Sequence, residues 1–371
     1  MQVYGSKELV EDVLNKDLCI GCGACVDLCP YFKTYKGKTA MIFPCTVQQG
    51  RCHAYCPKTE SDLTELSMSL FGKPYDGSPM GHHEKILIAR AGDKVHPAPF
   101  QAGGAVSALV TFAMKNGMVD AAVLTGRTGL IPYAELVTES ESVARFTTSK
   151  YMAAPTLSAF NQGVKQGFQK IGVVGTPCQM TALAQMSINP LHTENFKDSV
   201  ALKIGLFCTW ALDTRKLAAY LSSRLDITGI KAMDIPPPPA EILVLDMGGK
   251  TIEIPLSEIR PLVPRTCLLC PDMTSEWADV SVGVLEGEPK FNTLIIRTRT
   301  GQDLVDKAVA QGFLTIREMP AVNLDHLSAA ASNKKKRALA GAMEEGLLNT
   351  AENGKRAMMR IEKAVVERIL A

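Results

Sequence analysis

The strongest constraint on this chain is a run of four cysteines near its N-terminus, Cys-x2-Cys-x2-Cys-x3-Cys-Pro, over residues 19–30. This spacing is typical of bacterial ferredoxins, in which the fourth cysteine of a run binds a different iron–sulfur cluster from the first three. Gly21 and Gly23 allow the positive φ and close backbone approach that a cluster-binding loop needs. Paired Cys-x2-Cys motifs also bind zinc, but a zinc site requires neither a third thiol after two more residues nor a terminal Cys-Pro. The run therefore predicts iron–sulfur clusters and electron transfer.

The rest of the composition narrows the class of protein. Seven of the eleven cysteines lie within residues 1–57. No apolar stretch approaches the ~20 residues that cross a bilayer, and no signal peptide is visible. We therefore expect a cytoplasmic protein with thiolate ligands and no disulfides. The net charge of +2 and the 6% aromatic content give no argument for nucleic-acid binding. The Lys-Lys-Lys-Arg run at 334–337 is expected to be a solvated face or, alternatively, a docking patch for an acidic partner.

Three parts of the chain show different patterns. Residues 1–75 predict a small ferredoxin-like α+β domain whose fold depends on bound metal, because so short a segment lacks a core of its own. Residues 71–81 are rich in Gly and Pro and indicate a linker. Residues 84–325 alternate short apolar strands with amphipathic helices, which predicts an α/β domain with a mixed sheet. Residues 326–371 predict a helical tail that either packs on the protein or contacts another subunit.

The α/β region contains a definite series of expected elements. Strands are expected at residues 85–90, 120–125, 170–174, 200–206, 280–284 and 293–297. Helices are expected at residues 104–115, 158–169, 179–186 and 301–311. Residues 242–246 and 251–254 predict a β-hairpin. The four prolines at 236–239 are expected to form a stiff excursion before this hairpin.

The other N-terminal cysteines are spaced irregularly. Because the fourth cysteine of each run serves the other run's cluster, one 4Fe–4S cluster is assigned to Cys19, Cys22, Cys25 and Cys56. The second cluster is assigned to Cys29, Cys45 and Cys52. This set lacks a fourth thiol, so we expect a 3Fe–4S site or a cubane with a non-cysteine ligand. Candidate ligands are Gln48, Gln49 and His53.

The remaining four cysteines lie at loops or strand ends of the α/β region. Cys178 lies in a Gly-Thr-Pro-Cys-Gln strand-to-helix turn, Cys208 follows a strand, and Cys267 and Cys270 form a Cys-x2-Cys pair. Their positions predict a third 4Fe–4S cluster, with a zinc site as the alternative. Cys208 alone would be interpreted as an ordinary buried thiol. Three clusters give an expected iron content of about 11 or 12 per chain.

Several segments resemble, in the same order, the beta subunit family of coenzyme F420 hydrogenases and dehydrogenases. They are residues 100–109, 117–124, 148–152, 174–179, 204–208, 267–272 and 278–283. The resemblance implies FAD beside iron–sulfur clusters, with a deazaflavin or related hydride carrier near the flavin. The hydride chemistry would then belong to the flavin, so no catalytic side chain is expected.

The resemblance implies that three segments contact the flavin. They are Gln101, Gly103 and Gly104; Ser149, Lys150 and Tyr151; and Gly175, Thr176, Pro177 and Gln179. The first precedes a helix, whose free N–H groups can receive a flavin edge or pyrophosphate. The third lies at a strand-to-helix turn, where Gly175 lets a ring or phosphate approach the backbone. An ordinary helix start and a solvated loop are the simpler interpretations. No G-x-G-x-x-G fingerprint is present, so a standard dinucleotide fold is not expected.

These features lead to a functional hypothesis. We expect an oxidoreductase subunit that moves electrons between a hydride carrier, reduced coenzyme F420 or NAD(P)H, and a redox partner through FAD and the clusters. The expected partner is ferredoxin or a subunit of the hydrogenase, formate dehydrogenase or heterodisulfide-reductase type. The alternatives are an electron-relay subunit without a carrier site and a zinc-binding interaction module.

Overall fold

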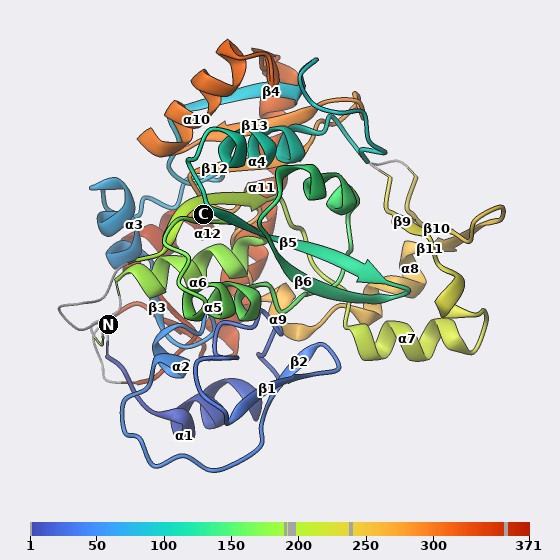
Figure 1. The fold of residues 1–371 in the computed structure, drawn as a ribbon. Coiled ribbons are helices and arrows are strands. Elements are labelled where there is room, and N and C mark those ends of the chain that lie inside the picture. Colours follow the sequence, from blue (N-terminus) through green and yellow to red (C-terminus); the bar gives the residue numbers. More distant parts are fainter. Residues whose placement is uncertain (1, 189–190, 192–197, 237–239, 352–354) are drawn as a thin grey trace.

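A mixed eight-stranded sheet forms the centre of the protein (Figure 1). The computed structural model describes residues 2–371 except 189–190, 192–197, 237–239 and 352–354. The strand order is β14-β4-β13-β12-β8-β7-β5-β6. The strands are β4 (Lys85–Ala91), β5 (Ala121–Thr128), β6 (Ile131–Val137), β7 (Ile171–Gly175), β8 (Val200–Leu206), β12 (Val280–Val284), β13 (Asn292–Ile296) and β14 (Leu314–Glu318). Strands β5, β7, β8 and β12 pair in parallel, whereas β6, β13 and β14 pair antiparallel to their neighbours.

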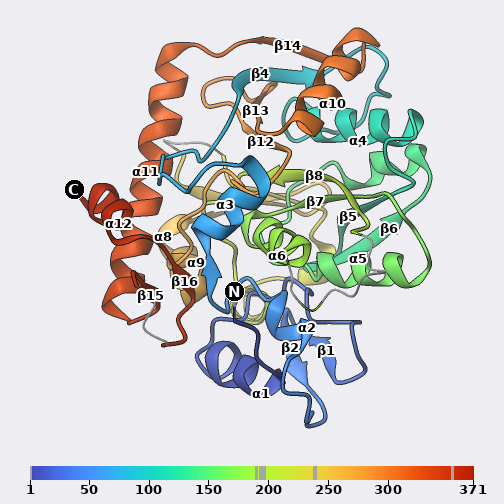
Figure 2. The ribbon, with the colours of Figure 1, turned by 90° about the vertical axis from the view of Figure 1, so that its left-hand side faces the viewer.

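Helices cover both faces of this sheet (Figure 2). They are α4 (Ala105–Lys115), α5 (Thr156–Lys165), α6 (Pro177–Ser187) and α10 (Arg299–Ala310). Neighbouring residues of β5 enter different cores, because Leu124 packs with α4 and α10 and Val123 packs with α5 and α6. Burial on both faces explains why the central strands are almost wholly apolar in sequence. The predicted α/β class with a mixed sheet is confirmed.

The elements predicted for residues 84–325 are present, with shifted ends. The predicted hairpin is β10 (Ile242–Asp246) with β11 (Thr251–Pro255), and β9 (Ala232–Asp234) adds a third strand. The helix α7 (Thr214–Ser222) packs in the same small core. Of the proline excursion predicted at 236–239, residues 237–239 lie outside the described part of the chain. Strands β6 and β14 were not predicted. Strand β6 shows no clear alternation, whereas residues 314–317 of β14 alternate apolar and polar side chains and were a signal that could have been used.

The N-terminal segment shares its core with the rest of the protein. It contains α1 (Ser6–Leu9), a π-helical turn (Val10–Leu14), β1 (Phe32–Tyr35), β2 (Lys38–Met41), α2 (Arg51–Ala54), β3 (Ser61–Asp62) and α3 (Leu63–Phe71). Its buried Leu18 and Phe32 belong to one apolar cluster with Leu157 of α5. The Leu157 amide donates to Cys22 O (3.0 Å), which fixes the cysteine loop to the start of α5.

The cysteine loop relies on two glycines. Gly21 and Gly23 have φ of 72° and 84°, as the sequence predicts. A Cβ on Gly23 would lie 2.7 Å from Ser158 N, and one on Gly21 would lie 2.1 Å from Gly37 O. Close packing therefore excludes a side chain at both positions.

The C-terminal tail packs against the protein itself. It consists of α11 (Ala321–Glu344), β15 (Leu348–Asn349), β16 (Met359–Arg360) and α12 (Lys363–Leu370). Strand β16 pairs in parallel with β3, so both ends of the chain contribute to one small sheet. The expectation of a solvated face at 334–337 is wrong for Lys334 and Lys335, which are 4% and 1% exposed. They lie on the same side of α11 as Ala338 and Leu339, which are also buried.

No helix in the described part of the chain is both long and apolar enough to cross a membrane.

Arg297 ties the region around residues 80–82 to the sheet. Its buried guanidinium donates to the carbonyl oxygens of Met80 (2.8 Å), His82 (2.8 Å) and Thr274 (3.0 Å) and to the hydroxyl of Ser281 (2.7 Å). Replacing Arg297 with Met leaves these buried acceptors unpaired, and we expect the free energy of unfolding to fall by about 3–5 kcal/mol. Anaerobic urea unfolding measures the change. The control is Arg299→Met at an exposed position; equal losses for the two variants would contradict the prediction.

Candidate functional site

The first group of thiols lies beneath the start of α5. Burial raises the pKa of Cys22 and Cys25 well above the ordinary value, and the nearby thiol of Cys56 raises both further. Burial also raises the pKa of Cys56 to about 12, and Cys19 adds to this shift. These four cysteines line a single cavity with Leu9, Val13 and Thr39. The structure thus brings together the four residues that the spacing assigned to one cluster.

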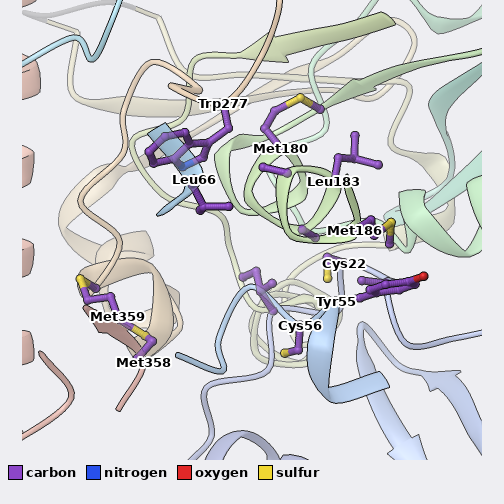
Figure 3. Packing of buried hydrophobic residues seen from close by; sticks show 14 of the residues in the cluster. Cys22, Tyr55, Cys56, Leu66, Met180, Leu183, Met186, Trp277, Met358 and Met359 are labelled. Atoms are coloured by element: carbon purple, nitrogen blue, oxygen red, sulfur yellow. The ribbon is translucent and has the colours of Figure 1, made fainter. Parts of the chain in front are cut away.

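Strand β2 supplies hydrogen bonds to this group. The amide of Thr39 donates to Cys19 Sγ (3.5 Å), and its hydroxyl lies 3.8 Å from Cys25 Sγ. Figure 3 shows Cys22 and Cys56 below the α6 residues Met180, Leu183 and Met186. Hydrogen bonds to sulfur and an apolar lining are two of the means by which proteins set cluster potentials.

The second group contains three thiols. Burial raises the pKa of Cys52 to about 11, with contributions from Cys29 and Cys45. His53 is 4% exposed, and its ring packs edge-on against Tyr4 with centroids 5.4 Å apart. Burial lowers the pKa of His53 to about 4.

None of the three candidate ligands is linked to the second group. Gln48 and Gln49 are exposed, and the Gln48 amide donates to Thr46 O (3.2 Å). In the described part of the chain, no hydrogen bond joins either glutamine side chain or the imidazole of His53 to these thiols. The fourth ligand of this group stays a prediction.

The third group lies at the carboxyl edge of the sheet. Cys178 and Cys208 follow the adjacent parallel strands β7 and β8, and Cys267 lies in α9 (Arg265–Leu268). Burial raises the pKa of Cys178 to about 11, and Cys270 and Cys267 contribute. Burial also raises the pKa of Cys208, and the other three thiols add to the shift. The four cysteines scattered through the sequence are therefore neighbours in the fold.

The first and third groups are adjacent. Cys178 contributes to the raised pKa of Cys22. Cys178 and Cys270 line a second cavity, which shares Pro57 and Lys58 with the cavity of the first group. Cys52 of the second group also contributes to the raised pKa of Cys25, so the second group lies near the first. The three groups therefore follow one another from the sheet to the N-terminal surface.

A zinc ion and an iron–sulfur cubane require different spacings of their thiolate ligands. Among the described residues, no three His, Cys, Asp or Glu side chains converge closely enough to hold one metal ion. Tetrahedral zinc at about 2.3 Å from each sulfur brings the sulfurs to about 3.8 Å from one another. In a cubane each thiolate binds a different iron, so wider spacing is required. All four thiols of the first group line one cavity, and Cys178 and Cys270 of the third group line another.

Buried charges surround the third group. Lys334 Nζ donates to Cys208 O (2.6 Å) and Asp272 O (2.7 Å). Lys335 forms a buried ion pair with Glu276 (2.8 Å) and donates to the hydroxyl of Tyr75 (2.9 Å). Burial raises the pKa of Glu276 to about 7. Lys334 and Lys335 lie four residues before Ala338 and Leu339, so helical spacing could have placed the two lysines on the buried face of α11.

Two of the predicted flavin segments meet at one place. The Gln101 amide donates to Tyr151 Oη (3.0 Å), and its carbonyl accepts from the Ser149 amide. The Tyr151 hydroxyl donates to Asp234 Oδ1 (2.9 Å) and accepts from the Ile235 amide (3.0 Å). Asp234 also accepts from Gln101. Sequence reasoning missed Asp234, because it lies in no motif.

Lys150 faces a second cation. Burial and the neighbouring guanidinium of Arg127 lower the pKa of Lys150 to about 8. Arg127 donates to Gly129 O (2.8 Å) and Lys231 O (2.7 Å), while its buried Nε has no partner. Among the described residues, neither cation forms an ion pair with a carboxylate. Two such charges without a counter-ion favour the binding of an anion.

Gly103 and Gly104 are packed against their surroundings. A Cβ on Gly103 would lie 2.8 Å from Asn292 Oδ1, which also accepts from the Ala105 amide (3.1 Å). Gly104 has a φ of 74°. Close packing at Gly103 and the positive φ of Gly104 therefore explain why glycine occupies both positions. The contact of these glycines with flavin stays a prediction.

The third predicted flavin segment caps α6. Gln179 is 4% exposed; its carbonyl accepts from the Thr176 amide (2.8 Å), and its amide donates to Ala154 O (3.0 Å) and Thr156 Oγ1 (2.9 Å). A Cβ on Gly175 would lie 2.8 Å from Gln179 Oε1. Pro177 is the first residue of the helix and is buried. This segment lies beside the third thiol group, since Thr176 Oγ1 is 3.3 Å from Cys178 Sγ; its contact with flavin also stays a prediction.

Comparison with known protein families gives three matches. Residues 86–161 match the N-terminal part and residues 168–322 the C-terminal part of the coenzyme F420 hydrogenase/dehydrogenase beta subunit. Residues 12–31 match the 4Fe–4S binding domain.

Individual proteins and structures agree with these matches. An uncharacterized protein of Methanocaldococcus jannaschii is 29% identical over 89% of this chain and 97% of its own length. The coenzyme F420 hydrogenase beta subunit of Methanosarcina barkeri is 26% identical over 69% of this chain and 89% of its own length. A chain from a structure of the F420-reducing hydrogenase complex of Methanosarcina barkeri has the same fold, with a TM-score of 0.66, 24% identity, and coverage of 72% of this chain and 93% of that one.

The 4Fe–4S match and the F420-related relatives indicate an iron–sulfur oxidoreductase that transfers electrons. Within that class, the chain belongs to the coenzyme F420 hydrogenase/dehydrogenase beta subunit family.

Proposed function

We propose that this chain transfers electrons between reduced coenzyme F420 and a redox partner through FAD and three iron–sulfur clusters. The observation that carries the proposal is that the first and third thiol groups line adjoining cavities, with Cys52 of the second group close enough to Cys25 to raise its pKa. The name of the Methanosarcina barkeri hydrogenase subunit supports coenzyme F420 as the carrier. NAD(P)H is the competing carrier, and an electron relay without a carrier site is the competing function.

Each thiol group is proposed to hold one cluster. The first cluster takes Cys19, Cys22, Cys25 and Cys56, and the third takes Cys178, Cys208, Cys267 and Cys270. The second takes Cys29, Cys45 and Cys52. This arrangement predicts about 11 or 12 irons per chain.

The flavin is proposed to lie between the carboxyl edge of the sheet and the Gln101–Tyr151–Asp234 hydrogen-bond network. Lys150 and Arg127 would hold its pyrophosphate, because they are partly buried cations with no carboxylate partner. When bound, FAD converts a two-electron hydride transfer into the single-electron transfers that clusters require. The residues of the network orient the ring and restrict water.

Anaerobically purified protein tests this function. Iron and flavin analysis should give about 11 or 12 irons and one FAD, and reduced coenzyme F420 should reduce a one-electron dye. If NADH or NADPH reduced the dye and coenzyme F420 did not, NAD(P)H would replace coenzyme F420 as the proposed carrier. Protein that contains clusters but no flavin would favour the electron-relay function. Iron near 4 per chain, or stoichiometric zinc, would overturn the three-cluster proposal.

The partner is proposed to dock on the N-terminal surface beside the second thiol group. Four of the exposed large apolar side chains lie close together in sequence around Cys45: Tyr35, Ile42, Phe43 and Val47, which are 49–61% exposed. Residues 28–59 contain five Lys or Arg and no Asp or Glu. An apolar patch within a basic segment is suited to an acidic electron-transfer protein, such as a ferredoxin.

A matched pair of variants tests the docking surface. Val47 and Val322 are 57% and 58% exposed. Val322 is the second residue of α11, and the start of this helix lies at the opposite end of the molecule from β1 and β2 (Figure 2). We expect Val47→Asp to lower the rate of electron transfer to ferredoxin about tenfold at low salt, because it adds a repelling charge. Val322→Asp should leave the rate unchanged. Stopped-flow kinetics measures both; equal rates for the two variants would exclude this surface.

A further inference from the structure

Lys334 is a buried cation next to the third thiol group. It lies in the middle of α11 and is 4% exposed. Its ammonium donates to Cys208 O (2.6 Å) and Asp272 O (2.7 Å), which belong to the segments that carry Cys208 and Cys270. The long helix of the tail thus places a positive charge against two of the loops that surround this group.

The neighbouring lysine provides a contrast. Lys335 pairs with Glu276 at 2.8 Å, so its charge is balanced locally. In the described part of the chain, no carboxylate oxygen lies within ion-pair distance of Lys334. The Asp272 carboxylate does act on Lys334 electrostatically, but the thiols of Cys270 and Cys208 act on it more strongly. Two buried cations therefore lie near the third group: Lys334, which acts on Cys208 and Cys267, and Lys58, which acts on Cys178 and Cys267.

A fixed positive charge beside a cluster changes the reduction potential of that cluster. Reduction of a 4Fe–4S cluster adds one electron and no proton, so it makes the site more negative by one charge. A buried cation stabilises this added charge, because electrostatic interactions are weakly screened inside a protein. The cation consequently raises the reduction potential.

We propose that Lys334 raises the reduction potential of the third cluster. The proposal rests on the proposed third cluster. In the test below, the electron comes from dithionite and is taken up by the cluster without a bond being formed or broken in the protein.

Potentiometric titration followed by electron paramagnetic resonance tests the proposal. The variants are Lys334→Gln, which removes the charge, Lys334→Arg, which retains it, and Lys336→Gln as a control on the same helix. At a fixed potential, Lys334→Gln should shift the reduced-to-oxidised ratio of one cluster at least about tenfold toward oxidised, which is about 59 mV for one electron. Lys334→Arg and Lys336→Gln should leave that ratio nearly unchanged.

The outcomes separate this inference from the proposed function. Unchanged potential in Lys334→Gln, with all iron retained, overturns the role of Lys334. If Lys334→Gln loses iron and Lys334→Arg does not, the third cluster needs the positive charge, which supports the proposal. If both variants lose iron, the proposed role of the charge is overturned. Absence of the third cluster from the unaltered protein would instead overturn the proposed function.

Discussion

Cys267→Ser is expected to lose about four irons per chain and to stop the carrier from reducing the N-terminal clusters. The third thiol group lies between the proposed flavin position and the first group, whose cavity adjoins its own. Removing the third cluster interrupts electron transfer from the flavin to the first cluster even though the other clusters remain. Iron analysis and visible spectra after addition of reduced coenzyme F420 measure the change. Dithionite should still reduce the clusters that are left.

Cys45→Ser is the matched control for this prediction. Cys45 belongs to the second group, at the N-terminal surface end of the series. Its replacement should remove the second cluster and electron transfer to ferredoxin, while the carrier still reduces the first and third clusters. If Cys267→Ser left carrier-driven reduction of the N-terminal clusters intact, the proposed order of electron transfer would be wrong.

Flavin binding is expected to weaken above pH 8. The pKa of Lys150 is lowered to about 8 by burial and by Arg127. A bound pyrophosphate raises that pKa, because it stabilises the charged ammonium. The affinity is therefore highest below about pH 8, where Lys150 is already charged in the free protein. It should fall by up to about tenfold for each pH unit above 8, until the pKa of the complex is passed.

Titration of the flavin-free protein with FAD between pH 7 and pH 9.5, followed by flavin fluorescence, measures this dependence. Lys150→Arg keeps the charge over the whole range, so its affinity should not vary with pH. Lys150→Gln should bind at least about tenfold more weakly at pH 7, also without pH dependence. A pH dependence that persists in Lys150→Gln would assign the effect to another group.

The sequence predicts the ligand groups better than it predicts their surroundings. Cys178 and Cys208 follow apolar strands, and strands that pair in parallel bring their carboxyl ends together. The position of each cysteine directly after a strand was therefore enough to predict that the two lie close to each other. Asp234 and Arg127 meet the flavin segments only through the tertiary fold. No local pattern distinguishes such residues from ordinary surface charges.

The lysines of α11 show that a run of charged residues does not by itself predict solvent exposure. Four consecutive basic residues indicated solvent exposure, because isolated buried charges are costly. Tertiary packing reversed this for Lys334 and Lys335 by supplying carbonyl oxygens and Glu276 as partners. Those partners lie some 60 residues or more away in sequence.

The sheet that β3 forms with β16 bears on how this protein can be engineered. Cluster-binding segments are often treated as interchangeable units that can be fused to other enzymes. Here Ser61 pairs with Met359, and the buried residues of residues 1–75 continue into α11 and α12. A transplant of the N-terminal segment alone would expose an apolar face and an unpaired strand edge. A working chimera would have to carry both ends of the chain, and mutations at the two ends are expected to be tolerated only in combination.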